Sequence, residues 1–382
     1  YKTVARGKTG DASRILISVE QAREVAGTSG DPLKVLESLP GVARPASAGP
    51  GAGALAVRGS APEDTRFYVD GLPLFQLYHF GNLYSVIQDE WIGAIDFRPG
   101  GFSAEYGNAT GGFLGITLRD LPQDGVHGHI DVNTFHTAAL LTVPVSDDWT
   151  LGFAFRRSYI DLILSAIFAD SESFSFTAAP RYYDYQFRVD YKPNSRTNAR
   201  FLVFGSDDLF TIVLNEPSDN DPNLGGFSFG RIFHQIQGTL TTGLTDTTDL
   251  YVGLMTGYQT LDITPGDLGF SLRLCPLTLR SHVTYRGVDK LTLRAGVLGT
   301  IQDYGVYVNL PAPPKEGEVV LPLSSREIEE QEESGLGGEA AAWFEANWRP
   351  AKAWNVIGGL RFNAWMGNFL AAGLDPRLTV RY

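Results

Sequence analysis

Three things are scarce in this sequence of 382 residues, and each scarcity excludes a class of protein. Cysteine occurs once, at Cys275, so no disulfide can form within the chain. Basic residues number 31 against 43 acidic ones, and the net charge of −12 argues against binding to nucleic acid, whose phosphates require a basic surface. Long apolar runs are missing too: residues 162–169 fall well short of the ~20 apolar residues that a membrane-spanning helix needs.

Aromatic residues, by contrast, are abundant. The sequence contains 16 Tyr, 23 Phe and 6 Trp, and transmembrane β-barrels place such rings in girdles at both membrane interfaces. A mean hydropathy of −0.07 agrees with such a barrel, because its strands alternate lipid-facing apolar residues with polar ones. The length exceeds that of a typical single domain, so two domains or one large barrel are expected.

Seven short motifs lie in a fixed order along the first third of the chain, between short strand signals at 55–58, 67–70 and 92–98. They are Asp31-Pro32-Leu33 with Leu36 and Leu39-Pro40-Gly41-Val42; Val57-Arg58-Gly59; Val69-Asp70-Gly71-Leu72-Pro73; Ile92 with Ile95; Arg98-Pro99-Gly100; Tyr106-Gly107; and Gly111-Gly112 with Ile116. In this order and spacing they resemble the plug domain of TonB-dependent outer-membrane receptors. The resemblance implies an α/β plug over residues 1–122 and a partial transmembrane β-barrel over 123–382. The family's energy-coupling box should precede the plug, where Tyr1–Val4 is the only candidate.

From residue 126 onward the pattern changes to long alternating strands. In 181–192, apolar and aromatic side chains fall on one face and polar ones, from Asp184 to Asp190, on the other. A period of two predicts strands with one apolar and one wet face. About twelve such segments occur: 126–135, 137–145, 149–159, 181–192, 197–206, 230–241, 247–260, 270–286, 290–303, 336–349, 354–366 and 371–382.

The connections between these segments alternate in length. The longer ones, 160–180, 207–229 and 304–335, are separated by short turns, and Trp149, Trp348 and Trp354 flank such turns. Outer-membrane barrels have short periplasmic turns and long external loops, so the long connections should share one face. A soluble β-sandwich would also alternate along its strands, but it explains neither the loop lengths nor the plug.

The count of strands leaves a gap. Plugged outer-membrane transporters are 22-stranded barrels, and about twelve strands are present here. Because unpaired strand edges are very unfavourable in lipid, we expect the remaining strands to come from the rest of a longer chain or from another polypeptide. The expected fold is therefore mainly β: a transmembrane antiparallel barrel with the α/β plug in its lumen.

No catalytic motif demands an enzyme or a cofactor. Residues 7–9 resemble the end of a phosphate-binding loop, but its first glycine and the preceding strand are missing. His127, His129 and Asp131 share one strand face, which is compatible with a metal site. The simpler interpretation is that they are polar residues facing the barrel lumen.

The candidate ligand site is the segment 75–84, which follows the Asp-Gly motif. In the family this segment lies at the top of the plug, so its rings and polar groups could stack on and hydrogen-bond to a ligand. The candidate residues are Phe75, Gln76, Tyr78, His79, Phe80, Asn82 and Tyr84. The alternative is that the segment packs the plug against the barrel wall. Arg58, Arg66 and Arg98 are expected to form ion pairs between plug and wall.

Two groups of acidic residues complete the candidates. One comprises Asp207, Asp208, Glu216, Asp219 and Asp221, and the other Glu316, Glu318, Glu327, Glu329, Glu330, Glu332 and Glu333. We expect both to lie in external loops. Such charges are usually only solvated, or they bind divalent cations that bridge lipopolysaccharide, or a cationic substrate.

The resemblance implies a receptor in the outer membrane of a Gram-negative bacterium that binds a scarce ligand, a small molecule or metal chelate, and imports it. Its implied partners are the TonB complex, outer-membrane lipids and lipopolysaccharide. An alternative is a receptor-derived structural or adhesive component that does not transport.

Overall fold

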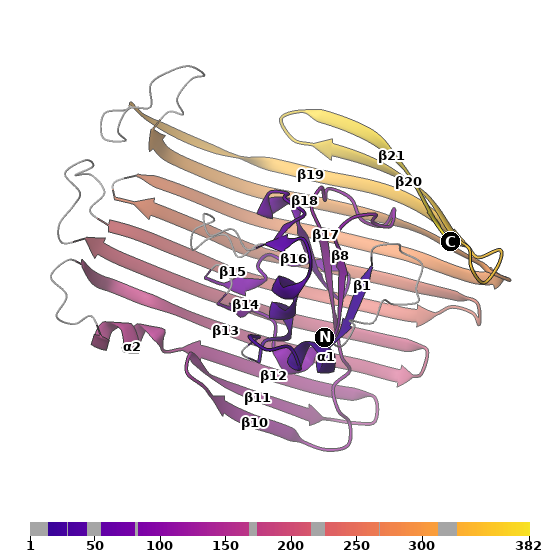
Figure 1. Ribbon diagram of the computed structural model, residues 1–382, viewed down its shortest axis with the longest axis horizontal. Helices are drawn as coiled ribbons and strands as arrows, with labels where there is room; N and C mark the ends of the chain where they lie inside the picture. The colour runs from indigo at the N-terminus through magenta and orange to yellow at the C-terminus, as the bar shows by residue number, and fades with distance from the viewer. Residues whose placement is uncertain are drawn as a thin grey trace.

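The structure, a computed structural model, describes residues 14–28, 30–43, 55–80, 83–167, 174–214, 226–266, 268–311 and 327–382. Its β structure falls into a small mixed sheet within the first 118 residues and a twelve-stranded antiparallel sheet after it. The small sheet lies against one face of the large one (Figure 1). We call the large sheet the wall, the face that carries the small domain its inner face, and the opposite face its outer face.

The small sheet has the strand order β1-β8-β9-β4-β5. Its strands are β1 (Ile15–Ser18), β8 (Ile92–Arg98), β9 (Phe113–Leu118), β4 (Arg66–Val69) and β5 (Leu72–Pro73). Only β4 and β9 are paired in parallel. Around this sheet lie α1 (Val19–Arg23), η1 (Pro32–Ser38), η3 (Pro62–Asp64), η4 (Asp89–Trp91) and two short pairs, β2 (Val42–Ala43) with β3 (Ala56–Val57) and β6 (Tyr78–His79) with β7 (Tyr84–Ser85).

Local sequence explains how these elements begin and turn. Ser18 and Gln21 form a reciprocal capping box at the start of α1, and the Asp31 carboxylate caps η1 by accepting from the Leu33 amide. Between β4 and β5, Asp70 has φ +48° and Gly71 φ +86°, the pair of positive φ values that a two-residue Asp-Gly hairpin turn requires.

The wall is a meander in which every strand pairs with its sequence neighbours. Its strands are β10 (His127–Val132), β11 (His136–Pro144), β12 (Trp149–Ser158), β13 (Phe174–Asn194), β14 (Thr197–Leu214), β15 (Gly226–Gly243), β16 (Thr248–Pro265), β17 (Gly269–Val288), β18 (Leu291–Pro311), β19 (Ile328–Trp348), β20 (Asn355–Met366) and β21 (Leu370–Arg381). All twelve predicted segments are strands. The predicted mainly β fold, with a domain against the inner side of an antiparallel wall, is confirmed.

The predicted strands are too short at the ends that carry the long connections. β13 begins at Phe174 instead of 181, and β19 at Ile328 instead of 336. The extension of β19 contains Glu329, Glu330, Glu332 and Glu333, so its charges hide the period of two that marks a strand between water and lipid. This extension is a strand because it is hydrogen-bonded to β18, and a search for alternating apolar and polar residues does not detect such a strand.

The two faces of the wall differ as predicted. On β17, Leu277 and Leu279 are exposed on the outer face, whereas Thr278 and Arg280 are buried on the inner face beneath the small domain. Trp149, Trp348 and Trp354 are all exposed beside short turns. Among the described residues, no helix has the length and apolar character to cross a membrane.

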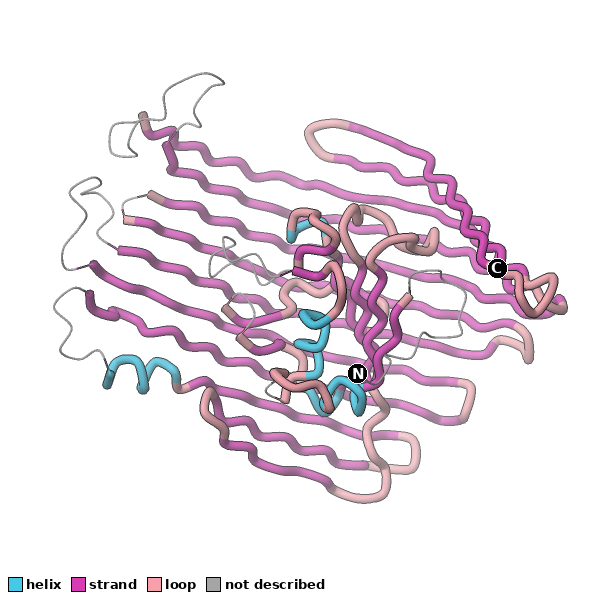
Figure 2. The backbone as a smooth tube through the Cα atoms, in the orientation of Figure 1, coloured by secondary structure: helices cyan, strands magenta, loops and turns pink. Residues whose placement is uncertain are grey.

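The long connections after β12, β14 and β18 leave the wall at one end of its strands, together with the short ones after β10, β16 and β20. The other five connections, all short, leave at the opposite end, which follows from the antiparallel strand order. One connection holds an element that we did not predict, the helix α2 (Ile160–Ile167), drawn in cyan in Figure 2. Residues 1–13, which include the candidate coupling box, lie outside the described part of the chain.

Candidate functional site

The interface between the small domain and the wall is rich in ion pairs and hydrogen bonds, beside an apolar patch that includes Leu202, Phe204 and Phe233 of the wall. The direction of its charges is the reverse of our prediction. We expected Arg58, Arg66 and Arg98 to reach the wall. Instead, Arg98 pairs with Asp96 on its own strand at 2.8 Å, and Arg66 donates to the Asn108 carbonyl within the small domain. The cations that cross the interface come from the wall: Arg156, Arg188, Arg200, Arg280, Arg294, Arg361 and Arg377.

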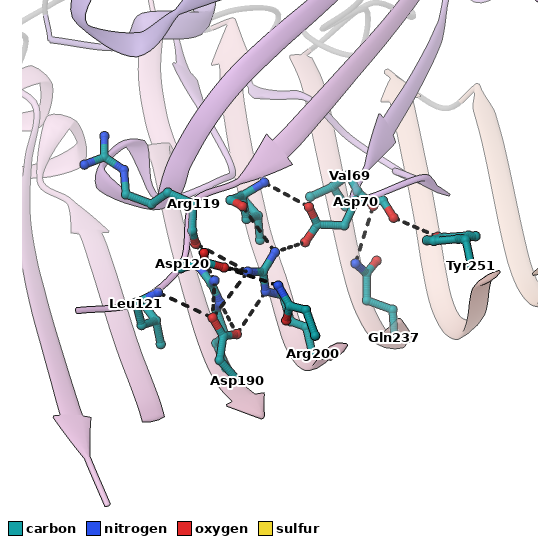
Figure 3. A network of polar contacts seen from close by, with 12 residues as sticks. Val69, Asp70, Arg119, Asp120, Leu121, Asp190, Arg200, Gln237 and Tyr251 are labelled. Carbon is teal, nitrogen blue, oxygen red and sulfur yellow. Dashed lines mark hydrogen bonds and ion pairs between the residues drawn. The ribbon is translucent and has the colours of Figure 1, made fainter. Parts of the chain in front are cut away.

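Arg200 of β14 joins the wall to the Asp-Gly turn (Figure 3). Its Nη1 lies 2.6 Å from Asp70 Oδ2 of the turn, and its Nε lies 2.9 Å from Asp190 Oδ1 of β13. The other Asp70 oxygen accepts from the Leu118 amide at 2.9 Å. The hairpin turn therefore points its carboxylate at the wall, which gives the Asp-Gly motif a structural purpose here.

The same turn is held on its other side by β16 and β17. Tyr251 donates its hydroxyl to the Asp70 carbonyl at 2.7 Å, and Arg280 donates to the Gly71 carbonyl. A Cβ atom on Gly71 would lie 2.7 Å from the Tyr251 hydroxyl oxygen. Glycine is thus required at this position both for its positive φ and for the close approach of the wall.

Glu105 is the second anchor of the small domain. Arg280 and Arg294 contact its two carboxylate oxygens at 3.1 and 2.6 Å. Burial raises the pKa of Glu105, but these arginines outweigh burial and lower the pKa to about 2. A lowered pKa stabilises the seated domain above the ordinary glutamate pKa of 4.5, and that contribution disappears as the pH falls toward 2.

The chain around Glu105 is also bound through its carbonyl groups. Arg377 donates to the Ser103 and Tyr106 carbonyls at 2.6 and 2.7 Å, and Arg361 donates to the Glu105 carbonyl at 3.0 Å. A Cβ on Gly107 would lie 2.5 Å from Arg361 Nε, so the Tyr106-Gly107 motif leaves room for this guanidinium.

The segment 75–84 forms the third anchor. Its Gln76, Tyr78 and His79 side chains are buried. Gln76 donates to Asp208 of β14 at 2.7 Å, and Tyr78 donates to the Leu33 carbonyl at 2.9 Å. Wall carboxylates and the core of the small domain therefore enclose His79 and Tyr78, which leaves neither side chain open to solvent.

The other candidate residues of this segment also contact the wall. Phe75 lies edge-on to Phe233, with ring centroids 6.0 Å apart, and Phe80 lies 6.1 Å from Phe229. Tyr84 packs against Arg156 and His136. Asn82 lies outside the described residues. These contacts favour the packing alternative, and the ligand-binding role of the segment stays a prediction.

The remaining candidates are scattered. His127 pairs with Asp124, and His129 lies 3.3 Å from Glu90 of the small domain, as expected for residues on the inner face. Within the described residues, no group of three His, Cys, Asp or Glu side chains is arranged to hold a metal ion.

Asp208 is not in an external loop: it is buried in β14. Glu329, Glu330, Glu332 and Glu333 belong to β19, while 215–225 and 312–326 lie outside the described residues.

A cavity of about 780 Å³ separates part of the small domain from the wall. Its lining includes Arg14, Asp96, Arg119, Arg200, Thr239 and Arg294. Because charged and hydroxyl groups dominate this lining, water can occupy the space next to two of the three anchors.

Sequence comparison identifies the small domain. Residues 9–113 match the family model of the TonB-dependent receptor plug domain. The chain carries the plug domain of a TonB-dependent receptor. From here the small domain is called the plug. A search of curated proteins finds no match.

Solved structures share the fold of both parts. The ferric enterobactin receptor of Pseudomonas aeruginosa, in a single-site mutant form, has a TM-score of 0.66 at 15% identity, covering 97% of this chain and 59% of its own. The siderophore receptor of Acinetobacter baumannii has a TM-score of 0.64 at 15% identity, and the match covers 97% of this chain and 59% of the receptor. A copper transporter has a TM-score of 0.64 at 12% identity, and the match covers 98% of this chain and 61% of the transporter. The chain thus spans about three-fifths of the length of these proteins.

The plug match and the barrel fold shared with these outer-membrane proteins confirm the predicted resemblance to TonB-dependent receptors and agree with an outer-membrane location. The sequence did not reveal the wall arginines as plug ligands. A usable signal was nevertheless present, since Arg188 and Arg280 sit at inner-face positions of alternating strands, where a charge needs a partner.

Membrane location makes a direct prediction for the outer face. Leu254 is 50% exposed there and pairs with Gly238 across β15 and β16. It lies ~20 Å along β16 from Thr248 at ~3.3 Å per residue. With a strand tilt of ~40°, this is ~15 Å along the membrane normal, near the middle of an apolar band about 25 Å tall. Leu254→Arg should destabilise the folded barrel by about 2–4 kcal/mol, measured by urea unfolding in lipid vesicles.

The matched control is Thr239→Arg, which places the same side chain on the inner face beside the polar cavity. This variant should unfold at nearly the wild-type urea concentration. Equal destabilisation by the two variants would mean that the outer face is not in lipid.

Proposed function

We propose that this protein is an outer-membrane receptor that binds a scarce extracellular ligand and imports it when energy delivered through TonB displaces the plug. We further propose residues 1–122 as the plug unit and 123–382 as its part of the barrel. The TonB complex, outer-membrane lipids and lipopolysaccharide are the proposed partners. The ligand is a small molecule or metal chelate, since the similar structures include a ferric enterobactin receptor and a copper transporter.

The observation that carries this proposal is the chemistry of the plug–wall interface. Its three anchors are ion pairs and hydrogen bonds centred on Asp70, Glu105 and residues 76–79. An apolar interface loses its full burial energy on separation, whereas charged and polar groups regain hydrogen bonds to water. Ion pairs and hydrogen bonds next to a polar cavity make up much of this seal, beside the apolar patch around Phe233. The seal can therefore open and close again, as transport through a plugged barrel requires.

The ligand-binding surface is proposed to include whatever part of Phe75, Phe80 and Tyr84 becomes reachable when the plug moves. These three side chains make fewer hydrogen bonds than those of Gln76, Tyr78 and His79, which anchor the segment. In this proposal, the segment acts as both anchor and recognition element.

The test compares binding with uptake. Gram-negative cells that express the full-length receptor are incubated with a radiolabelled ferric catecholate siderophore, copper(II), cobalamin or an oligosaccharide. We expect one probe to bind to the cells whether or not the inner membrane is energised. Its accumulation should fall at least tenfold when a protonophore is added or TonB is deleted.

The structural or adhesive alternative gives a different result. A component that does not transport would show no energy-dependent accumulation of any probe, although surface binding could persist. Accumulation that ignores both the protonophore and the loss of TonB would contradict coupled import and leave a passive pore.

A further inference from the structure

His79 occupies an unusual position between two carboxylates of the wall. Its Nδ1 lies 2.6 Å from Asp208 Oδ1 of β14, and its Nε2 lies 3.1 Å from Asp184 Oδ2 of β13. The ring stacks on Tyr182 of β13 with centroids 4.1 Å apart and an interplanar angle of 14°. His79 is 0% exposed, and both aspartates are almost completely buried.

This geometry fixes the protonation of the ring. A neutral imidazole carries one N–H, so it can donate to one aspartate only and must turn a lone pair toward the other. A carboxylate oxygen has no hydrogen to give, and two facing acceptors repel each other. Both contacts are attractive only when each ring nitrogen carries a proton, that is, when His79 is an imidazolium.

The surrounding charges require the same proton. Asp184 has a second cationic partner, Arg156, at 2.6 Å. Apart from its contact with His79, Asp208 accepts a hydrogen bond from the neutral side-chain amide of Gln76. Without a charge on His79, Asp208 would be a buried carboxylate held by neutral donors, which is costly in a dry interior. The other titratable or charged groups around the ring are His136 of β11, Tyr182 of β13, Arg231 of β15, and Asp31 and Tyr84 of the plug.

We propose that His79 is a buried proton-binding site, and that the proton it holds between Asp184 and Asp208 locks residues 76–80 and 83–85 of the plug onto the wall. The occupancy of this site does not depend on the proposed transport function. If the plug does move in transport, its release exposes His79 to water and is linked to loss of this proton.

The sign of the pH dependence follows from the two environments. Burial alone would lower the pKa of His79, but Asp208 and Asp184 outweigh burial and raise the pKa above its ordinary value of 6.5. The lock is therefore fully present below about pH 6.5. It weakens as the pH rises through the raised pKa, with the ratio of locked to released segment falling about tenfold per pH unit in that window.

The first test measures the proton itself, on the unchanged full-length receptor in lipid nanodiscs. Nitrogen NMR of ¹⁵N-histidine-labelled protein separates imidazolium from neutral tautomers. The signal that disappears in His79→Gln is assigned to His79. We expect His79 to be mainly an imidazolium at about pH 6.5, where an ordinary histidine is half neutral, and a neutral tautomer at this pH would overturn the proposal.

The second test measures the lock. Backbone hydrogen exchange of the Leu83 and Val86 amides, which donate to the His79 and Leu77 carbonyls, is followed from pH 6 to 9 after correction for intrinsic exchange. Protection should fall with rising pH in the wild type and become independent of pH in His79→Gln. The exposed His127→Gln serves as the matched control and should behave as wild type.

Protection that does not change with pH in the wild type would overturn the lock. Neither measurement uses a ligand or TonB, so a failure here leaves coupled import standing. Conversely, the loss of energy-dependent uptake would leave the proton site standing.

Discussion

Replacing Arg200 by alanine is expected to destabilise the seated plug by about 3–5 kcal/mol. The guanidinium bridges Asp70 of the plug and Asp190 of the wall, and all three side chains are less than one-tenth exposed. Removing one partner of a buried ion pair leaves the other as an uncompensated buried charge. Asp190 would keep Arg188 at 2.5 Å, so most of the effect should fall on Asp70.

The measurement is hydrogen exchange of the Leu118 amide, which donates to Asp70, together with a heat-modifiability gel that reports barrel folding. Arg196→Ala is the matched control. Arg196 pairs with Asp246 at 2.6 Å, but the pair is largely exposed, so its loss should change stability by about 0–1 kcal/mol. Equal protection in the Arg200 variant and the wild type would show that the plug is not seated through this cluster.

The wall strands could be predicted because the alternation that defines each of them lies within a short stretch of sequence. A strand between lipid and a wet lumen must alternate, and the alternation in β13 and β17 is visible in the sequence. Short turns between such strands leave a meander as the simplest topology. The ends of β13 and β19 were missed because, beyond the membrane, hydrogen bonding alone maintains a strand.

The plug was predictable from its motifs rather than from its physics. The reasons for those motifs became visible only in the assembled structure. Gly71 admits Tyr251, and Gly107 admits Arg361, from residues far along the chain. A sequence shows that glycine stands at these positions, but it does not show which side chain fills the space left free.

The candidate site shows the same limit. The alternation placed Asp184 and Arg188 on the wet face correctly, but it did not indicate that Asp184 meets His79, 105 residues away in sequence. Asp208 was assigned to a loop because the predicted strand ended at residue 206. Only the register of β13 with β14 brings Asp184 and Asp208 to the two sides of one imidazole.

The direction of the interface charges was the clearest error. Arg58, Arg66 and Arg98 belong to the plug, and we expected them to form ion pairs with the wall. Their surroundings within the plug already supply acceptors, as the pairing of Arg98 with Asp96 shows. The wall carries the long arginine side chains because strands standing apart from the plug need reach, whereas a compact plug can offer short carboxylates and carbonyls.

The central claim is that the plug must leave the wall for import to occur, and a covalent tether tests it most directly. A Cβ on Gly359 of β20 would lie 2.8 Å from the Ala104 Cβ of the plug. Since Cβ atoms in a disulfide lie ~3.8 Å apart, a small shift accommodates the bond. The variant Ala104→Cys, Gly359→Cys is made in a Cys275→Ser background, which removes the one cysteine of these 382 residues.

The control pair is Ala346→Cys with Gly358→Cys, which are register partners on β19 and β20 and tie wall to wall. With the probe that binds the receptor, we predict normal binding to both oxidised variants. Uptake by the plug–wall tether should fall at least tenfold and recover on reduction, while the wall–wall control imports normally. Import at the control rate by the fully oxidised plug–wall variant would contradict the account.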